Sequence, residues 1–179
     1  MKWLLSFLVL GFNLLSFAQH ITLEIPQHHV NEATESEESS FTTYITKKYF
    51  FVTFFKANFF RAHQYCQLNN MELLTIDSKE EESVFMNLIN AKDFEFKTAK
   101  DFWTSGNDLG EEGKFYFLTN GKSVGKLNWA KNEPNNGRRA DSNETENCMG
   151  YTMTENLKFY RLFDRFCSIK SNFICQSIE

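Results

Sequence analysis

The chain has 179 residues and a formal net charge of −4, and no stretch gathers lysine and arginine into a basic face. This acidic balance gives no electrostatic route to nucleic acid or to an anionic membrane surface, so both partner classes are excluded. The length is that of one domain, and a hydrophobic content of 42% is sufficient for a packed core.

Residues 1–18 predict a secretory signal peptide. Lys2 precedes an apolar run, WLLSFLVLGFNLLSF, that is shorter than the roughly 20 residues needed to span a bilayer. Ser16-Phe17-Ala18 has the small-x-small pattern of a cleavage site, which places the cut after Ala18. The loss of Lys2 takes the net charge to −5. We therefore expect a secreted, extracellular protein without a membrane span.

Residues 19–43 predict a flexible, acidic N-terminal extension. Its sequence HVNEATESEESSFTT is rich in Ser, Thr and Glu, and it holds too little apolar surface to offset the entropy of ordering it. The folded domain is therefore expected over residues 44–179.

The first part of this domain predicts a strand and a helix. β-Branched and aromatic residues from Tyr49 to Phe55 indicate a strand. Asn58 then stands at a helix N-cap position, and apolar residues follow at helical spacing as far as Leu68. We expect an amphipathic helix that carries the first cysteine of the domain, Cys66.

A short strand, ELLTI, and a second helix come next. Ser78 and Glu81 form a capping box, and three successive glutamates lie in the first turn, where the helix dipole favours negative charge. The expected buried stripe of this helix consists of Val84, Phe85, Leu88 and Ile89.

The second half of the chain predicts short strands joined by turns. Asn120-Gly121 is a strong hairpin signal, and CMGYTM, KFYRLF and SNFICQ indicate three strands. Residues 130–147 form a polar loop with almost no apolar side chains. The sum is an α+β domain, with two helices followed by an antiparallel sheet that carries one long loop.

The long loop is rich in oxygen donors. Carboxylates and amide carbonyls suit calcium far better than zinc or copper. Composition alone leaves two readings open, an ion-binding loop or a solvated loop that is polar because loops are exposed. The donors are Glu133, Asn135, Asn136, Asp141, Glu144, Glu146 and Asn147.

Four cysteines follow the signal peptide: Cys66, Cys148, Cys167 and Cys175. An even number in a secreted chain predicts two disulfides, for which three pairings are possible.

The order of these features resembles the C-type lectin family over Thr43 to Gln176, in particular the short-form, single-domain secreted lectins similar to those of insects. The segments that carry the resemblance are Cys66 on a helix, the stretch FWTSGND, Asn128-Trp129, the EPN triplet Glu133-Pro134-Asn135, and the closing Cys…FIC pattern.

The resemblance implies a fold, a disulfide pattern and a site. The fold would be C-type lectin-like, with two helices packed on antiparallel sheets, and the disulfides would be Cys66–Cys175 and Cys148–Cys167. The principal calcium ion, Ca²⁺, and the sugar would share one set of ligands, in which a cis Glu133-Pro134 bond aims the flanking side chains and Asp164 also offers its backbone carbonyl. That set is Glu133, Asn135, Glu146 and Asp164.

The EPN order resembles that of lectins for mannose, fucose and N-acetylglucosamine, whose vicinal hydroxyls replace water on the ion. Phe163 departs from the family pattern, because Leu162-Phe163-Asp164 stands where a Trp-Asn-Asp motif is expected. Phenylalanine removes one calcium ligand and one sugar hydrogen bond, at a cost on the order of 1–3 kcal/mol.

An auxiliary calcium site is half present. Asp108 and Glu112 match the family's positions, whereas Asn136 and Asn147 stand where aspartate is usual. The loop also inserts Arg138-Arg139, which either pair with Glu133 or Glu146 in place of calcium or are solvated.

Three further expectations complete the interpretation. Asn143-Glu144-Thr145 is an N-glycosylation sequon, so Asn143 is a candidate glycosylation site. The chain is not expected to be an enzyme, because the cysteines are bridged and His63 is the only histidine of the domain. The alternative to a glycan or glycoprotein ligand is a calcium-independent module of the same fold that binds a protein partner. The sequence leaves oligomeric state open.

Overall fold

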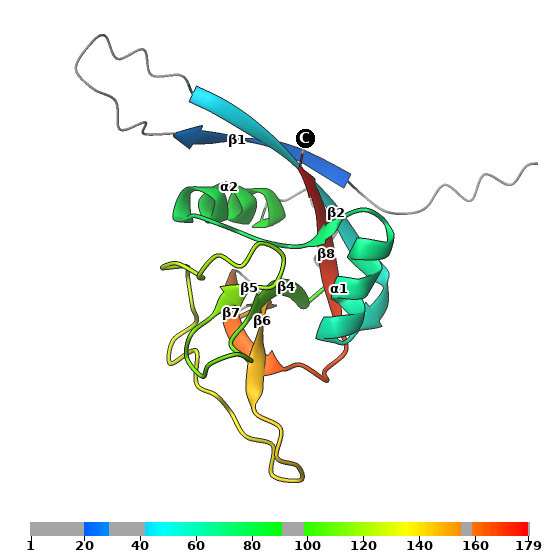
Figure 1. Cartoon of the computed structure of the whole chain (residues 1–179), viewed down its shortest axis with the longest axis vertical. Helices are drawn as coiled ribbons and strands as arrows, with labels where there is room; N and C mark the ends of the chain where they lie inside the picture. The colour runs from blue at the N-terminus through cyan, green and yellow to red at the C-terminus, as the bar shows by residue number, and fades with distance from the viewer. Residues whose placement is uncertain (1–19, 29–41, 91–98, 155–158, 179) are drawn as a thin grey trace, which may run out of the picture.

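The computed structural model describes residues 20–28, 42–90, 99–154 and 159–178. Its strands are β1 (His20–His28), β2 (Thr42–Ala57), β3 (Glu72–Leu73), β4 (Asp101–Asn107), β5 (Tyr116–Phe117), β6 (Glu146–Met153), β7 (Tyr160–Phe166) and β8 (Ser171–Ile178). Its helices are α1 (Phe59–Leu68) and α2 (Lys79–Asn90). Two helices and a sheet confirm the α+β prediction (Figure 1).

One sheet organises the molecule, with the strand order β1-β2-β8-β4-β6-β7. β4 and β8 run parallel where Phe102 and Trp103 face Asn172 and Phe173, whereas the other neighbours along this path are antiparallel. β3 pairs with β8, and β5 pairs with β4. This order places β6 and β7 at one edge, and both strands contribute predicted site residues.

The first strand differs from the expected flexible extension. Residues His20–His28 form β1, which pairs antiparallel with β2 from His20 opposite Phe50 to His28 opposite Thr42. The segment ITLEI alternates apolar and polar residues, a period-two pattern that favours a strand and that the acidic composition of the following residues obscured. Residue 19 and residues 29–41 lie outside the described residues, as does the predicted signal peptide.

Both helices begin as their capping residues predict. The Asn58 side chain accepts a hydrogen bond from the Arg61 backbone N–H at 2.9 Å, and the Ser78 hydroxyl accepts one from the Glu81 N–H at 3.1 Å. The expected apolar faces are only partly buried, because Leu68 is 74% exposed and Val84 is 40% exposed.

Two glutamates in the first turn of α2 are buried and hydrogen-bonded, in addition to placing negative charge at the start of the helix. Glu81 is buried against the Lys47 ammonium group at 2.6 Å and the Tyr49 hydroxyl at 2.9 Å. Glu82 is fully buried and accepts hydrogen bonds from the Tyr151 hydroxyl and the Asn128 backbone N–H. A buried carboxylate needs such partners, and here they attach α2 to β2, to β6 and to the start of the long loop.

Two disulfides close the domain. Cys66–Cys175 joins α1 to β8, and Cys148–Cys167 joins β6 to the residue that follows β7. They are the two pairs implied by the family resemblance. The bridged residues are 109 and 19 positions apart in the chain, separations that correspond to about 4–5 and about 3 kcal/mol in the chain-entropy description.

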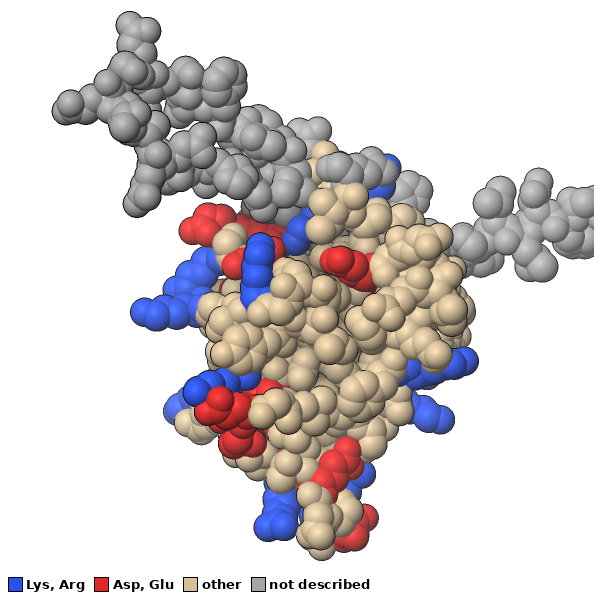
Figure 2. Space-filling view, viewed as in Figure 1, with Lys and Arg blue, Asp and Glu red and all other residues tan. Residues whose placement is uncertain are grey.

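The long loop and the β1–β2 arm project from opposite ends of the molecule (Figure 1). The face in Figure 2 carries both signs of charge around a broad uncharged area, and acidic and basic side chains adjoin each other at its lower end. In the part of the chain that the structure describes, no helix is long and apolar enough to cross a membrane.

Candidate functional site

The long loop is fixed to β7 at its start and continues into β6 at its end. The Ala130 N–H donates to the Leu162 carbonyl at 2.9 Å, and the Leu162 N–H donates to the Asn128 carbonyl at 3.1 Å. Asp164 lies two residues further along β7, so it shares a face with Leu162. Both side chains are buried, whereas Phe163 between them is half-buried and lies opposite Gly150 of β6.

Asp164 holds the EPN segment by its backbone. Its carboxylate, 3% exposed, accepts the Asn135 N–H on both oxygens at 3.0 and 3.1 Å and the Asn136 N–H at 2.6 Å. Hydrogen bonds to a charged acceptor are the stronger kind. Asp164 therefore ties two residues of the loop to the sheet across about thirty positions of sequence.

Glu133 lies between Asn135 and Asp164. The Asn135 side-chain amide donates to both Glu133 carboxylate oxygens at 2.8 and 2.9 Å, and the Glu133-Pro134 peptide bond is cis. Burial, followed by the hydrogen bond with Asp164 and its charge, raises the pKa of Glu133 to about 7. The charge of Glu146 contributes to the rise. Three carboxyl groups are thus close enough to repel one another.

Glu146 reaches the same place from the start of β6. Its carboxylate accepts the Gly137 N–H at 3.1 Å, and burial, followed by the charge of Asp164, raises its pKa. A Cβ atom on Gly137 would collide with the Glu146 carboxylate and lie 3.1 Å from the Asn135 side-chain oxygen. The bare backbone of Gly137 therefore lets the Asn135 and Glu146 side chains approach each other.

The four predicted ligands thus form one contiguous cluster. The Asn135 oxygen and the three carboxylates are hard donors of the kind that calcium prefers. Within the described residues, no three His, Cys, Asp or Glu side chains gather closely enough to hold a metal ion by themselves. Backbone N–H groups and the Asn135 amide are instead the partners of these oxygens.

Asp108 and Asn136 each leave a buried oxygen unsatisfied. One Asp108 carboxylate oxygen accepts the Gly113 N–H at 2.8 Å, whereas its other oxygen and the Asn136 side-chain oxygen have no hydrogen-bond partner among the described residues. Burial is the main cause that raises the pKa of Asp108, and the charge of Asp164 adds to it. Glu112 is exposed, and its pKa is raised by desolvation and then by the charges of Asp108 and Asp164. The Asn147 side chain hydrogen-bonds Thr145 instead.

One interpretation of the sequence paired the inserted Arg138 and Arg139 with Glu133 or Glu146 in place of calcium. The structure gives both arginines other partners. Arg139 pairs with Glu144 at 3.0 Å and lies 4.5 Å from the centre of the Phe166 ring. Glu144 also accepts hydrogen bonds from the Ser168 N–H at 3.1 Å and hydroxyl at 2.8 Å. Arg138 donates to the Asn143 side-chain oxygen at 3.2 Å. We call Arg139, Glu144, Phe166 and Ser168 the loop anchor.

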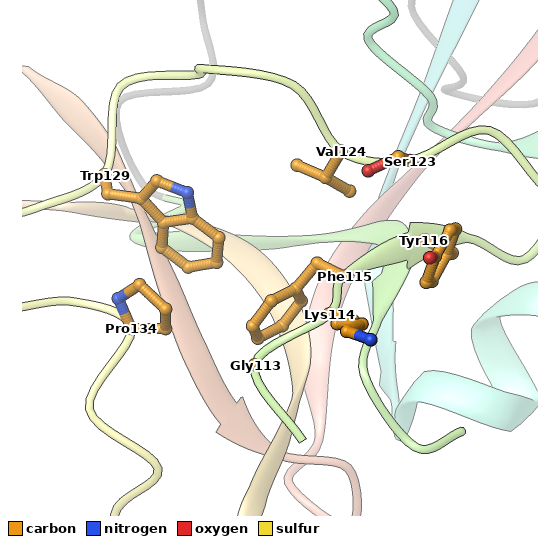
Figure 3. Close-up of a pocket in the computed structure, with 8 residues that line it drawn as sticks. All are labelled: Gly113, Lys114, Phe115, Tyr116, Ser123, Val124, Trp129 and Pro134. Atoms are coloured by element: carbon orange, nitrogen blue, oxygen red, sulfur yellow. The ribbon is translucent and has the colours of Figure 1, made fainter. Parts of the chain in front are cut away.

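A pocket of about 400 Å³ adjoins the EPN segment, at residues that were not among the predicted site residues. In Figure 3 the rings of Trp129 and Phe115 lie side by side, with Val124 and Pro134 on either side of them. The ring centroids are 5.0 Å apart. The sequence feature that could have indicated this pocket is the pair of aromatic residues, Phe115 and Trp129, within a turn-rich stretch.

These features define a lectin-like domain with an acidic and amide-lined loop. The sequence model of the lectin C-type domain matches residues 55–177. The chain therefore belongs to the C-type lectin domain family.

Two insect relatives are similar over much of the chain. C-type lectin mosGCTL-7 of Aedes aegypti is 31% identical over 102 residues, which are 57% of this chain and 63% of the relative. C-type lectin 37Da of Drosophila melanogaster is 30% identical over 139 residues, which are 74% of this chain and 69% of the relative. The match thus spans less than two thirds of the mosquito protein. These relatives are lectins, a class of binding proteins.

Solved structures show the same fold. The carbohydrate-recognition domain of human scavenger receptor C-type lectin superposes with a TM-score of 0.58 at 22% identity, covering 74% of this chain and 92% of that domain. The C-type lectin domain of murine dendritic cell inhibitory receptor 2, solved in complex with an N-glycan, superposes with a TM-score of 0.57 at 19% identity, covering 74% and 91%.

Proposed function

We propose that the protein is a secreted, calcium-dependent lectin that binds glycans of the mannose, fucose or N-acetylglucosamine type. Membership of the C-type lectin family supports the general class of function. Among proteins of the same fold, the murine receptor was solved with an N-glycan and SPL-1 with N-acetylglucosamine.

One observation carries the proposal, the hydrogen bonding of the Asp164 carboxylate to the backbone N–H groups of Asn135 and Asn136. This contact holds the EPN segment, which includes Glu133, against β7. Gly137 then brings Asn135 and Glu146 together from the other side. These contacts support the proposal that four oxygen-bearing side chains from three segments of the chain serve one ion site.

The donor set fits a calcium ion. Glu133, Asn135, Glu146 and Asp164 would hold the principal ion, and Asp108 and Glu112 would contribute to an auxiliary one. Two features of the described residues support this fit: mutually repelling carboxyl groups, one with a pKa of about 7, and the unsatisfied buried oxygens of Asp108 and Asn136. Bound calcium would neutralise the carboxylates and accept two vicinal sugar hydroxyls.

The protein's own side chains would fix which sugar binds. Glu133 offers only acceptors for hydroxyl protons, whereas Asn135 offers an N–H₂ donor and a carbonyl acceptor. The Asn135 side-chain amide donates to the Glu133 carboxylate at 2.8 Å, so both groups are already oriented toward the proposed sugar site. The EPN order of acceptor and donor is the basis for proposing mannose-type ligands.

Titration with calcium, and with terbium as a luminescent substitute, tests ion binding. Retention on mannose resin, with and without chelator and beside galactose resin, then tests the sugar. We expect saturable ion binding and chelator-sensitive retention on mannose only. Glu133→Gln should abolish both, while Asp141→Asn, which alters an exposed carboxylate on the same loop, should retain both. Chelator-resistant retention, or none at all, would contradict the proposal.

A second candidate function is a calcium-independent module that binds a protein partner. Two observations favour it. Phe163 replaces an expected oxygen ligand, and the loop anchor attaches Arg139 and Glu144 to Phe166 and Ser168 by direct side-chain contacts. If no ion binds in the titration, this candidate replaces the first.

Secretion after removal of residues 1–18 and glycosylation at Asn143 complete the proposal. Asn143 is exposed and lies within the turn that the Arg139 N–H closes on the Glu144 carbonyl. Expression in insect cells, with N-terminal sequencing of the medium protein and glycosidase digestion, tests both points. A start at residue 19 and a glycosidase-dependent mass shift lost in Asn143→Gln are the expected results.

A further inference from the structure

The paired arginines of the long loop, Arg138 and Arg139, point to a processing site. We propose that the Arg139–Ala140 peptide bond is cut by a protease that recognises paired basic residues. The product is a two-chain protein joined by the Cys66–Cys175 disulfide. Cleavage at this bond does not depend on a bound ion or sugar.

The chain has two pairs of adjacent basic residues, and their surroundings differ. Lys47-Lys48 lies within β2, which pairs with β1 on one side and with β8 on the other, and Lys47 is 5% exposed. A protease binds its substrate as an extended segment in its own cleft, which a strand paired on both sides cannot enter. Arg138 and Ala140 are exposed, as are the three residues that follow Ala140. Burial and backbone pairing therefore select Arg138-Arg139.

The turn that contains the proposed scissile bond can open locally. The carbonyl of that bond, on Arg139, accepts the Ser142 N–H at 3.4 Å, which is longer than an ordinary hydrogen bond. The Arg139 N–H donates to the Glu144 carbonyl at 3.1 Å. Exposed loops of small and polar residues are preferred sites of proteolytic nicking, because they open without unfolding the domain. The long loop projects from one end of the molecule, where a protease can approach it (Figure 1).

The loop anchor restrains this cut without preventing it. The protease must draw the Arg139 side chain into its specificity pocket, and that guanidinium group lies 3.0 Å from the Glu144 carboxylate and 4.5 Å from the centre of the Phe166 ring. The ion pair is partly exposed and therefore weak. Cleavage of a segment that opens and closes rapidly follows the population of its open form. The anchor should therefore slow cleavage by a small factor.

The nicked protein should remain folded. Hydrolysis adds one water molecule across the amide: the C–N bond breaks, Arg139 gains a carboxylate and Ala140 gains an ammonium group. The two chains interleave in the sheet, because β2 and β4 precede the cut, β8 and β6 follow it, and the four strands alternate in the order β2-β8-β4-β6. The Cys66–Cys175 disulfide adds a covalent link between the chains.

The candidate ligand cluster lies on the sheet side of the cut. The Asn135 N–H donates to the Asp164 carboxylate, and the Glu146 N–H donates to the Gly137 carbonyl at 3.0 Å. Neither contact includes a residue between the cut and Thr145. Cleavage should therefore free the outer part of the loop and leave the cluster in place.

Limited digestion of the folded, glycosidase-treated protein with a purified protease specific for paired basic residues tests the site. N-terminal sequencing should find a fragment that begins at Ala140, and a denaturing gel should show one band without reductant and two with it. Arg138→Gln and Arg139→Gln should each abolish the cut. Lys131→Gln, which removes an exposed lysine from the same loop, should leave it unchanged. Melting temperatures measured before digestion show that each variant is folded.

Glu144→Gln tests the restraint by the loop anchor. It removes the ion pair with Arg139 but keeps both arginines, so cleavage should become roughly two- to fivefold faster. Glu111→Gln, which breaks an exposed ion pair with Lys114, is the matched control and should be cut at the native rate.

Three outcomes would overturn the proposal. The first is a folded protein that stays intact while the reduced and unfolded chain is cut at Arg139. The second is a fragment that begins at Tyr49 before any that begins at Ala140, since cleavage after Lys48 requires unfolding of the sheet. The third is a fragment that begins at Arg139, which would assign the cut to a different bond.

Discussion

The Asp164 carboxylate accepts the Asn136 backbone N–H at 2.6 Å, and through this contact a strand of the sheet controls the loop that carries the candidate ligands. The two residues are 28 positions apart in the chain. The position of the EPN segment therefore depends on β7.

Replacing Asp164 by Asn should loosen this contact. The variant keeps the side-chain shape but removes the charge and turns one acceptor atom into a donor that faces backbone N–H groups. We expect a loss of about 1–3 kcal/mol in unfolding free energy, faster amide exchange at Asn135 and Asn136, and loss of mannose binding. Asp141→Asn is the control. Unchanged exchange at both amides would show that the contact is not needed.

Gly137→Ala tests the approach of Asn135 and Glu146. The new Cβ atom would collide with the Glu146 carboxylate and push it away from the Asn135 oxygen. We expect calcium affinity to fall at least roughly tenfold, with little change in melting temperature, because Gly137 lies in the loop and not in the core. Gly125→Ala adds the same methyl group in open space and should behave as the native protein. Native affinity in Gly137→Ala would place the ion elsewhere.

The pKa of Glu133 predicts opposite effects of pH with and without calcium. Its pKa rises from an ordinary 4.5 to about 7, so the folded state holds more protons than the unfolded state between these values. Stability without calcium should therefore fall as pH rises through this window. The raised pKa values of Glu146 and Asp108 act in the same direction, whereas the pKa of His63, which burial lowers from its ordinary 6.5, opposes them within this window.

Calcium binds the deprotonated carboxylates, so its affinity should fall as pH drops below about 7. Melting temperatures at pH 5 and 7.5, each with calcium or chelator, measure both effects. Glu133→Gln should weaken the pH dependence seen in chelator. An unchanged pH dependence in Glu133→Gln would contradict the assignment of the raised pKa to Glu133.

Arg139→Ala should release the loop anchor. The ion pair with Glu144 is partly exposed and contributes below about 1 kcal/mol, to which stacking on Phe166 adds a similar amount. We expect faster amide exchange over residues 138–145 and a larger fall in melting temperature in chelator than in calcium. Arg138→Ala is the matched control. An equal fall in both conditions would mean that ion binding does not order the loop.

Phe163→Asn tests the departure from the family pattern. An amide at this position would add a calcium ligand and a sugar hydrogen bond, so mannose affinity should rise by a factor of roughly ten or more. Glycan-array or calorimetric binding measures the change. A fall in affinity would show instead that the Phe163 ring itself contacts the sugar.

Local patterns fixed much of the secondary structure. The strand at Tyr49, the cap at Asn58, and the start of α2 after Ser78 all follow from periodicity and capping, which depend on neighbouring residues. The segment that forms β1 shows the limit of this reasoning. Its strand pairs with β2 across the intervening residues 29–41, and the composition of the segment gave no sign of that partner.

The sequence by itself determined which oxygen-bearing side chains the loop carries and in what order, and its even number of cysteines predicted two disulfides. The tertiary structure decided how those groups are used. The Asp164 carboxylate binds backbone N–H groups, Arg139 pairs with Glu144 rather than with Glu133 or Glu146, and the pocket forms beside Pro134. The physical reason is that hydrogen-bond partners depend on sheet register and on which distant segments meet, and neither is written in the local pattern.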